Sequence, residues 1–438
     1  MKPISSNMFK LTAISAMILS TTSASAALYQ VIEVKPQTTF AFESVYGVAI
    51  QPGNVVGGNS LGCFADGTTD CESSFKLAGE TRLVATHAGQ AIDGLSYREE
   101  APFGIDNGFI YVQDDERDFE RYCRTDLRYA ICETWADIRW NVWKKEINGV
   151  QTPNSIAFIE GQATPIDETK NVVVNSLTAN AEPIGITLTP GDVTGSRRNS
   201  VKALVANTSI NIDAGLQTRA WKTDGTYTVG SIAHEKTNNQ GNFYTSKGAI
   251  WDSLGTMTEI PWQTTNTERD NRLAQGSLRD VTVKDGNIYA VGYNTFYDDR
   301  NFMQASVSSV KVGESNWITK PVTGATVREN GTGGDFIHSH SLLTAVNEHG
   351  IAIGEAKLSR AESGAYANRL FVVPDIKDPK ANFLNGSLFF AGAGGKAGAI
   401  NNFNEIVGQI DTEETREVGG KPRRKRGFIY PYGTELQG

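Results

Sequence analysis

Short apolar runs on either side of a polar turn recur along this chain. In each copy an apolar residue leads into a turn with Gly or Asn, and a second apolar residue followed by Gly closes the unit. Two β-rich runs around such a turn predict a β-hairpin. The clear copies occupy residues 48–57, 221–230, 283–292, 345–354 and 399–408, and a weaker copy occupies 185–195.

A further short strand is predicted after most copies. These strands fall at residues 203–205, 248–251, 305–307, 369–373 and 427–430. The closing glycines Gly230, Gly292, Gly354 and Gly408 are spaced by 62, 62 and 54 residues. Repeats of this length are typical of propeller blades, which must stack because one blade cannot bury both faces. We therefore predict an all-β fold, a β-propeller-like ring of about six or seven blades, with a β-sandwich as the alternative.

Residues 60–150 interrupt the repeats and contain a stretch of helical periodicity. Its apolar residues recur at spacings of three and four, which indicates one apolar face. These residues are Phe119, Cys123, Leu127, Ile131, Trp135, Ile138 and Val142, with Trp140 and Trp143 beside them. We interpret the stretch as a small helical insertion packed on the β body, rather than as an aromatic platform for a ligand. The repeat domain as a whole is predicted to span residues 27–438.

The insertion also contains all the cysteines, Cys63, Cys71, Cys123 and Cys132. An even, clustered set in an oxidising compartment predicts disulfides, whereas zinc binding is disfavoured because no C-x-x-C spacing occurs. Three pairings exist, and the short loops favour 63–71 and 123–132. The second pair requires a break in the helix, since nine helical residues separate two α-carbons by about 13 Å and a disulfide needs less than about 7 Å. Thr125-Asp126 is the expected start of a second helix.

The N-terminus carries the features of an export signal. Lys2 and Lys10 supply positive charge, residues 11–19 are apolar, and Ala-Ser-Ala at 24–26 fits a cleavage site. These features predict a signal peptide at 1–26, with an uncleaved anchor as the alternative. No later stretch approaches the roughly 20 apolar residues of a membrane span, although a longer parent chain with a C-terminal anchor stays open. We expect a protein of the periplasm, the cell surface or the medium.

The charge of the chain limits its partners. The net charge is -8, and removing Lys2 and Lys10 with the signal leaves -8 - 2 = -10. An acidic protein is a poor candidate for binding nucleic acid or an anionic membrane. We expect neither, and consider a glycan or a cell-surface protein as the partner.

Two segments resemble a known repeat. Residues 248–261 and 399–408 are similar to units of the HAF-type extracellular repeat, and the chain resembles an uncharacterised secreted family of Gram-negative bacteria with such repeats. Residues 120–140 resemble that family's N-terminal region. The chain departs from the pattern, because the His-Ala-Phe opening is Gly-Ala-Ile at 248–250 and Gly-Phe-Ile at 427–429. The resemblance implies export and repetition but no activity and no catalytic residues.

Sequence motifs of known chemistry are incomplete. The chain has no H-E-x-x-H and no complete Walker loop. Residues 392–397 match G-x-G-x-x-A, but a predicted hairpin follows where a dinucleotide site needs a helix. We therefore assign no catalytic residue and no organic cofactor.

Two groups are candidates for cation binding. His338 and His340 would share one face of a strand and could bind a divalent metal with Asp335, with exposed loop histidines as the alternative. A second candidate is an acidic run that suits calcium by its oxygen ligands but lacks EF-hand spacing, so a solvated loop is the other interpretation. That run consists of Asp114, Asp115, Glu116 and Asp118.

Near the C-terminus the acidic run 411–417 precedes the basic run 421–426. Opposite charges on the two arms of a hairpin would pair across the strands, which we favour over a polyanion site.

We also predict that residues 29–34 form a strand beside residues 399–432 and close the ring, because closure removes exposed strand edges.

The predicted function is a non-catalytic, exported, propeller-like binding or cell-surface scaffold protein. The alternative is an exported enzyme that acts on polysaccharide with carboxylates at the mouth of the propeller. That enzyme would need two carboxylates converging at about 5–9.5 Å.

Overall fold

A computed structural model gives the structure of the chain. It describes residues 45–52, 75–82, 97–98, 115–159, 162, 164–194, 197–206, 208–209, 216–239, 241–269, 272–296, 300–325, 337–415, 417–418 and 421–433. The predicted signal peptide, the predicted closing strand at 29–34, Cys63 and Cys71 lie outside these residues.

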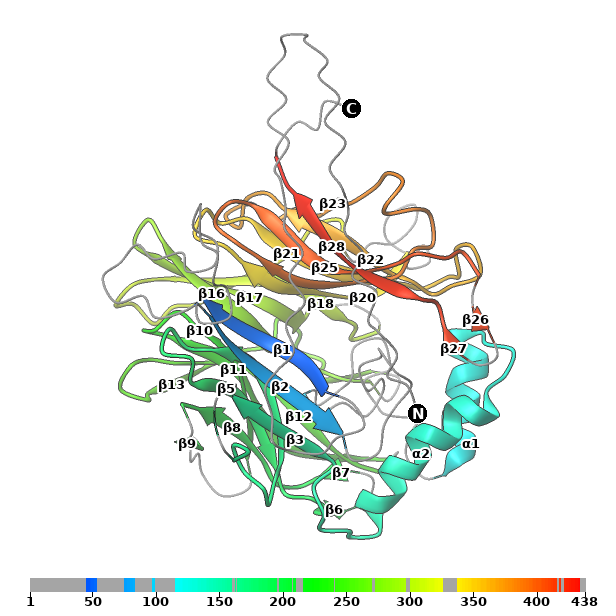
Figure 1. Cartoon of the computed structure of the whole chain (residues 1–438). Helices are drawn as coiled ribbons and strands as arrows, with labels where there is room; N and C mark the ends of the chain where they lie inside the picture. The colour runs from blue at the N-terminus through cyan, green and yellow to red at the C-terminus, as the bar shows by residue number, and fades with distance from the viewer. Residues whose placement is uncertain are drawn as a thin grey trace, which may run out of the picture. The chain divides into compact units, whose positions relative to one another are not determined.

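Six antiparallel sheets follow one another along the described chain (Figure 1). The first consists of β1 (Val45–Pro52), β2 (Phe75–Arg82) and β3 (Ser155–Ile159). The second consists of β4 (Asn171–Leu177), β5 (Pro183–Leu188), β8 (Val201–Val205) and β9 (Thr208–Ser209). The third consists of β10 (Gln217–Thr223), β11 (Thr228–Asn238), β12 (Gly241–Trp251) and β13 (Met257–Ile260).

The remaining sheets have the same meander order. The fourth consists of β16 (Ser277–Lys284), β17 (Asn287–Thr295), β18 (Met303–Lys311) and β19 (Ile318–Pro321). The fifth consists of β20 (His338–Val346), β21 (Ala352–Leu358), β22 (Asn368–Val373) and β23 (Asn382–Phe383). The sixth consists of β24 (Gly395–Ile400), β25 (Glu405–Asp411) and β28 (Lys425–Pro431). Three small hairpins pair β6 (Val193–Thr194) with β7 (Arg197–Arg198), β14 (Glu268–Arg269) with β15 (Arg272–Leu273), and β26 (Glu417–Val418) with β27 (Lys421–Pro422).

Successive sheets pack face to face and form the core between them. Between the fourth and fifth sheets, for example, Val291 and Val307 pack with Leu343 and Phe371. The first strand of each sheet also contacts the first strand of the next, from β1 through β4, β10, β16 and β20 to β24. Contact between first strands is what a propeller requires, because its sheets share an axis and their first strands lie innermost. The predicted all-β, propeller-like class is confirmed, with six sheets in the described part of the chain.

The recurring glycine of the sequence pattern marks a β-bulge. In every one of the six sheets the first strand has a one-residue irregularity, and a glycine of the second strand pairs beside it. A β-carbon on Gly230 would lie 1.8 Å from the Arg219 carbonyl oxygen, and one on Gly292 would lie 2.0 Å from that of Ser277. Close approach of the bulged strand therefore requires glycine at this position. The six glycines are Gly79, Gly185, Gly230, Gly292, Gly354 and Gly408.

Two of the predicted hairpin copies were placed wrongly. Residues 48–52 belong to β1, whose partner is β2 rather than a strand immediately after the turn, so the glycine of the first sheet is Gly79 and not Gly57. In the second sheet the glycine beside the bulge is Gly185, at the start of the copy assigned to 185–195. The degenerate pattern does not distinguish a tight hairpin from a strand that pairs across a long connection.

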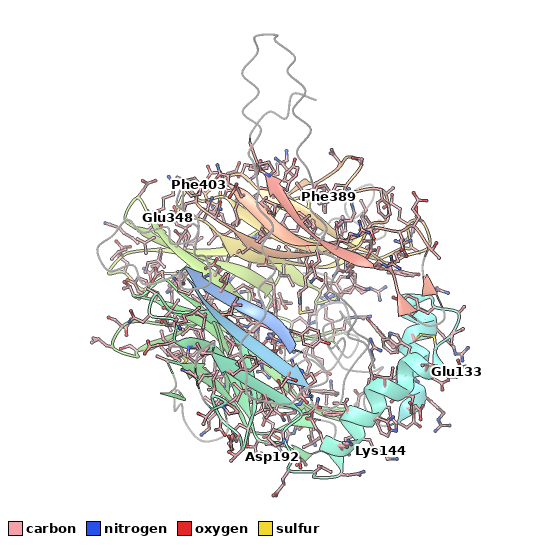
Figure 2. All side chains as sticks on the ribbon, in the orientation of Figure 1. Glu133, Lys144, Asp192, Glu348, Phe389 and Phe403 are labelled. Carbon is pink, nitrogen blue, oxygen red and sulfur yellow. A yellow bond between two sulfur atoms is a disulfide. The ribbon has the colours of Figure 1, made fainter. Side chains whose placement is uncertain are left out.

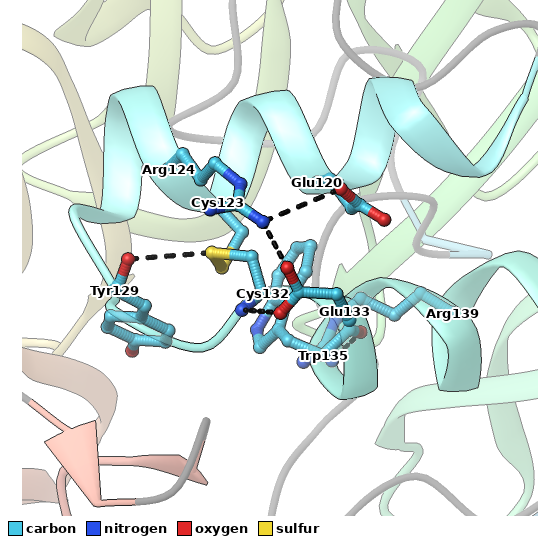
Figure 3. Close-up of a disulfide and its surroundings, with 8 residues drawn as sticks. All are labelled: Glu120, Cys123, Arg124, Tyr129, Cys132, Glu133, Trp135 and Arg139. Atoms are coloured by element: carbon cyan, nitrogen blue, oxygen red, sulfur yellow. Dashed lines mark hydrogen bonds and ion pairs between the residues drawn. A yellow bond between two sulfur atoms is a disulfide. The ribbon is translucent and has the colours of Figure 1, made fainter.

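The helical insertion lies between β2 and β3 in the chain. It contains α1 (Glu116–Tyr122), the π-helical turn η2 (Cys123–Leu127) and α2 (Glu133–Ile147). Cys123 and Cys132 form a disulfide with α-carbons 5.7 Å apart (Figure 3). The helix breaks as the disulfide requires, because Arg128 after η2 is left-handed with φ 59°. The second helix starts at Glu133, later than the predicted Thr125-Asp126 cap.

The described helices are all short. None of them is long and apolar enough to cross a bilayer.

Candidate functional site

The two ends of the sheets differ in the length of their connections. We call the end where β4, β10, β16, β20 and β24 begin the loop end, and the opposite end the turn end. At the turn end the first and second strands of the second to sixth sheets are joined by residues 178–182, 224–227, 285–286, 347–351 and 401–404. At the loop end lie the longer connections 189–200, 296–302, 359–367 and 412–424, together with the helical insertion.

Labelled side chains mark both ends in Figure 2. Glu348 and Phe403 lie in turns of the turn end, whereas Asp192, Glu133 and Lys144 belong to the connections and helix of the loop end. Binding and catalytic residues of rigid scaffolds are concentrated on long loops. The loop end is therefore the candidate functional face.

A buried carboxylate on β2 starts a polar network where the innermost strands meet. Glu80 is 1% exposed and accepts hydrogen bonds from Arg82 Nη2 at 2.9 Å, from Arg98 and from the Val174 backbone N–H at 2.7 Å. Burial alone would raise the pKa of the Glu80 carboxyl, but the Arg98 and Arg82 charges outweigh it and hold the pKa below its usual value. Glu80 is therefore ionised at neutral pH and joins the first sheet to the second.

The network continues through the bulge of the second sheet. Arg98 Nε donates to Asn175 Oδ1 at 2.8 Å, and Asn175 Nδ2 donates to the Ala220 carbonyl at 2.7 Å. The neighbouring Ser176 hydroxyl donates to the Trp221 carbonyl at 2.8 Å. The Asn175 and Ser176 bonds cross from the second sheet to the third, and Arg98 links Glu80 of the first sheet to Asn175 of the second. These side chains therefore set the relative position of the first three sheets.

Aromatic rings and a guanidinium group complete the network in the third and fourth sheets. The Arg279 guanidinium lies 3.5 Å from the centre of the Trp221 ring and 5.3 Å from that of Tyr293. Trp221 and Arg279 are the bulge residues of β10 and β16, as Asn175 is of β4. We call the set of Glu80, Arg82, Arg98, Asn175, Trp221, Arg279 and Tyr293 the inner-strand network.

A second buried cluster fixes the helical insertion to the loop end. Tyr97 Oη donates to Glu146 Oε1 of α2 at 2.8 Å, and Arg198 Nε of β7 donates to Glu146 Oε2 at 2.8 Å. The Arg198 guanidinium lies 4.6 Å from the centre of the Tyr97 ring and 5.1 Å from that of Trp143. Burial, with a further contribution from the Glu146 charge, raises the pKa of Tyr97, so its hydroxyl stays protonated.

Other buried acceptors also bind a backbone N–H of the next sheet. Asp280 Oδ2 accepts from Val346 at 3.0 Å, and Glu355 Oε2 accepts from Ala397 at 3.4 Å. Burial raises the pKa of Asp280 above its usual value. Glu80, Asp280 and Glu355 thus each join one sheet to the next.

The histidines of the predicted metal site are buried in β20. His338 and His340 are each 2% exposed, and the His338 ring stacks on Phe383 with centroids 4.9 Å apart. The Met303 backbone N–H donates to His340 Nδ1 at 3.2 Å. Asp335 lies outside the described residues, and within them no three His, Cys, Asp or Glu side chains converge as metal ligands. A metal at this place stays a prediction.

The acidic run of the predicted calcium loop begins helix α1. Asp115 is its N-cap and accepts from the Asp118 backbone N–H at 3.2 Å, while Arg117 pairs with the same carboxylate. Glu116 and Asp118 occupy the first turn, where negative charge is favoured. Asp114 lies outside the described residues.

The charged runs near the C-terminus pair with each other, as predicted. Asp411 of β25 lies opposite Lys425 of β28, and Arg424 approaches Glu413 at 3.5 Å. Arg423, 5% exposed, donates to the carbonyls of Gly392 and Ser363 at 2.7 and 2.8 Å. The G-x-G-x-x-A segment at 392–397 therefore meets an arginine of its own chain and leads into the β24–β25 hairpin.

The inner-strand network was not predicted from the sequence. The sequence does carry one signal for its bulge residues. In the second to sixth sheets the bulge residue of the first strand lies nine, ten or thirteen residues before the glycine of the second strand. Glu80 and Arg98 carry no such signal, since their partners are distant in sequence.

No curated protein matches this chain. Solved structures that are similar include an α-L-arabinanase mutant of Cellvibrio cellulosa, at 10% identity and TM-score 0.28, covering 57% of this chain and 85% of that one. A chimera described as ACO/RPE65 has 9% identity and TM-score 0.31, covering 62% and 60%. A gluconolactonase of Xanthomonas campestris has 9% identity and TM-score 0.24, covering 60% and 81%.

A protein-family model matches residues 199–436, which is more than half of the chain. These residues include the end of the second sheet and the whole of the third to sixth sheets. The chain belongs to the family described as "Protein of unknown function (DUF3466)".

Proposed function

We propose that this protein is an exported, non-catalytic binding protein or cell-surface scaffold that holds its ligand at the loop end of the propeller. The helical insertion and the connections 189–200, 296–302, 359–367 and 412–424 lie there, whereas at the turn end two to five residues join the first strand to the second in the second to sixth sheets. A rigid scaffold that varies its loops at one end is the usual arrangement of a binding surface. The Cys123–Cys132 disulfide supports export, because disulfides persist in oxidising compartments.

The proposal of a non-catalytic function rests on the ionised, buried state of the Glu80 carboxylate. A general acid for glycoside cleavage needs a raised pKa and room for substrate beside a second carboxylate. Glu80 is ionised, buried and held by Arg82, Arg98 and the Val174 N–H. Asp280 does have a raised pKa, but it accepts from the backbone N–H groups of Val281 and Val346. These bonds support a structural role for both carboxylates.

The proposed ligand is a glycan. Sites for such ligands combine aromatic faces with a few polar groups that fix orientation. Tyr366 supplies a partly exposed ring in the connection 359–367 at the loop end, with the Arg128 guanidinium and the Lys357 ammonium group each 5.9 Å from its centre.

The test is a binding and cleavage assay on the chain from Ala27 onward. Affinity electrophoresis against a panel of neutral and uronic-acid polysaccharides should show retardation by one member, with no new reducing ends after long incubation. Tyr366→Ala at the loop end should weaken the retardation at least tenfold. Leu254→Ala is the matched control, because Leu254 is 89% exposed at the turn end.

Steady release of reducing ends by the wild-type protein would instead establish the polysaccharide-cleaving alternative. Equal retardation of the Tyr366→Ala and Leu254→Ala variants would move the binding surface away from the loop end.

A further inference from the structure

The connection 359–367 holds the ring of Tyr366 on a rigid support at the loop end. Its tip, residues 362–365, is a tight turn closed by two backbone hydrogen bonds of 2.9 and 3.0 Å. Arg423, in the connection 412–424, donates to the Ser363 carbonyl of this turn at 2.8 Å. The partly exposed Tyr366 ring is therefore fixed in place before any ligand arrives, which lowers the entropy cost of binding.

The helical insertion reaches the same ring with Arg128. This residue is the C-cap of the π-helical turn η2, with φ 59°, and its backbone N–H donates to the carbonyl of Cys123 in the disulfide. Its guanidinium lies 5.9 Å from the centre of the Tyr366 ring. An element inserted between strands of the first sheet thus meets a connection of the fifth sheet at Tyr366.

Arg128 differs from the arginines that precede it in the insertion. Each of those three forms an ion pair with a carboxylate of the insertion itself, namely Arg117, Arg121 and Arg124. Arg128 is exposed, and among the described residues no carboxylate pairs with it. The ammonium group of Lys357, a residue that is 8% exposed on β21, lies 5.9 Å from the same ring. Two positive groups therefore flank one accessible aromatic ring.

We propose that the ligand of this site is an acidic polysaccharide, bound where the insertion meets the fifth sheet. The ring of one uronic-acid residue packs against Tyr366, and its carboxylate binds the Arg128 guanidinium. A guanidinium can bind a carboxylate through two parallel hydrogen bonds, and aromatic side chains commonly line ligand sites. The inference rests on the proposed binding function and narrows it from glycans in general to those that carry carboxylates.

The overall charge of the chain makes such binding a local event. With a net charge of -8, the protein as a whole repels a polyanion. Exposed charges act over a Debye length of about 8 Å at physiological ionic strength. Binding of an acidic polymer would therefore depend on the positive groups at the site, so removing one of them should have a large effect.

Affinity electrophoresis of the chain from Ala27 onward tests the proposal with paired polymers. Polygalacturonate, alginate and polyglucuronate are each compared with the same polymer after its carboxyl groups have been reduced to alcohols. At least one acidic form should bind the wild type at least tenfold more tightly than its reduced form does. Arg128→Asn should abolish this preference, because it removes the guanidinium while asparagine tolerates a left-handed backbone.

Lys144→Gln is the matched control. It removes one positive charge from the exposed end of α2 that lies away from Glu133 and the disulfide (Figure 2). This variant should bind both forms of each polymer as the wild type does. Arg128→Lys, which keeps the charge but not the two parallel donors, should retain part of the preference. Thermal unfolding of Arg128→Asn should match that of the wild type.

Two results would overturn the inference and leave the proposed glycan binding standing. One is equal binding of acidic and reduced polymers by the wild type, and the other is an equal effect of Arg128→Asn and Lys144→Gln. Binding of no polysaccharide at all, acidic or neutral, would instead reject the proposed function itself.

Discussion

Glycine is the residue that makes the repeat visible in the sequence. Each of the six glycines lies beside a bulge. At five of them a carbonyl of the bulged strand occupies the space of a β-carbon, and at Gly79 the Phe158 ring occupies it. The sequence predicted the glycines in four of six sheets but not their role, because a bulge depends on pairing between strands rather than on local pattern. The bulge also supplies Asn175, Trp221 and Arg279 to the inner-strand network.

Gly230→Ala should therefore be strongly destabilising. The new methyl group would overlap the Arg219 carbonyl, and overpacking of this kind typically costs about 3 kcal/mol. The free energy of unfolding from urea titration measures the effect. Gly47→Ala is the control, since a β-carbon there meets nothing within 4 Å. Similar losses in both variants would contradict the explanation.

His338 makes the stability of the fifth sheet depend on pH. Burial, followed by the Arg369 charge, lowers the pKa of His338 to about 4 from 6.5. The unfolded chain therefore binds a proton below pH 6.5 that the folded chain does not bind until about pH 4, so stability falls as the pH drops through this window. The full difference amounts to about 3 kcal/mol.

Thermal unfolding between pH 7.5 and 4 checks this expectation. His338→Phe should flatten the pH dependence, because phenylalanine can stack on Phe383 and cannot be protonated. His234→Gln is the control, since His234 is partly exposed beside Glu259. A profile as steep in His338→Phe as in wild type would assign the dependence to other groups.

At the scale of elements, the helical insertion shows how a disulfide interrupts a helix within a stretch of helical periodicity. The spacing from Phe119 to Val142 predicted one apolar face, and Phe119, Cys123 and Trp135 of that face do share a core with Trp143. Ile131, however, is 43% exposed, because the chain turns at Arg128 to bring Cys132 to Cys123. Periodicity alone could not place this break, whereas the disulfide geometry required one.

Replacing both Cys123 and Cys132 by serine should loosen this element selectively. Closing a loop of this size stabilises by about 2–3 kcal/mol through the unfolded state. Hydrogen exchange should accelerate in residues 116–147, while β16–β22 keep their protection. Parallel loss of protection in those strands would show that the insertion and the sheets unfold as one unit.

At the scale of the whole molecule, each sheet packs on its neighbours in the chain. The all-β class, the repetition and most of the hairpins could be predicted, since they rest on local alternation and turns. The inner-strand network could not, because Glu80 meets Val174 and Arg98 meets Asn175 only after the sheets have stacked.

Neighbour-only packing predicts additive mutational effects between distant sheets. Ile186→Ala in the second sheet and Phe371→Ala in the fifth should each cost about 3–5 kcal/mol, and the double variant should equal their sum within about 0.5 kcal/mol. Leu343→Ala with Phe371→Ala, which share one core, should deviate clearly from additivity. Denaturant titration of the wild type and the five variants decides between the two patterns.

The position of the helical insertion within the first sheet has a consequence for folding during synthesis. β2 and β3 are neighbours in that sheet but are separated by residues 83–154, whereas each of the next four sheets is complete within fewer than 50 consecutive residues. When such a chain emerges N-terminus first, β1 and β2 must wait for the insertion before β3 can join them. β1 and β2 are thus made first but stay an open hairpin until β3 has been synthesised. Cys123 and Cys132 are synthesised between β2 and β3, so their oxidation can occur before the first sheet is complete.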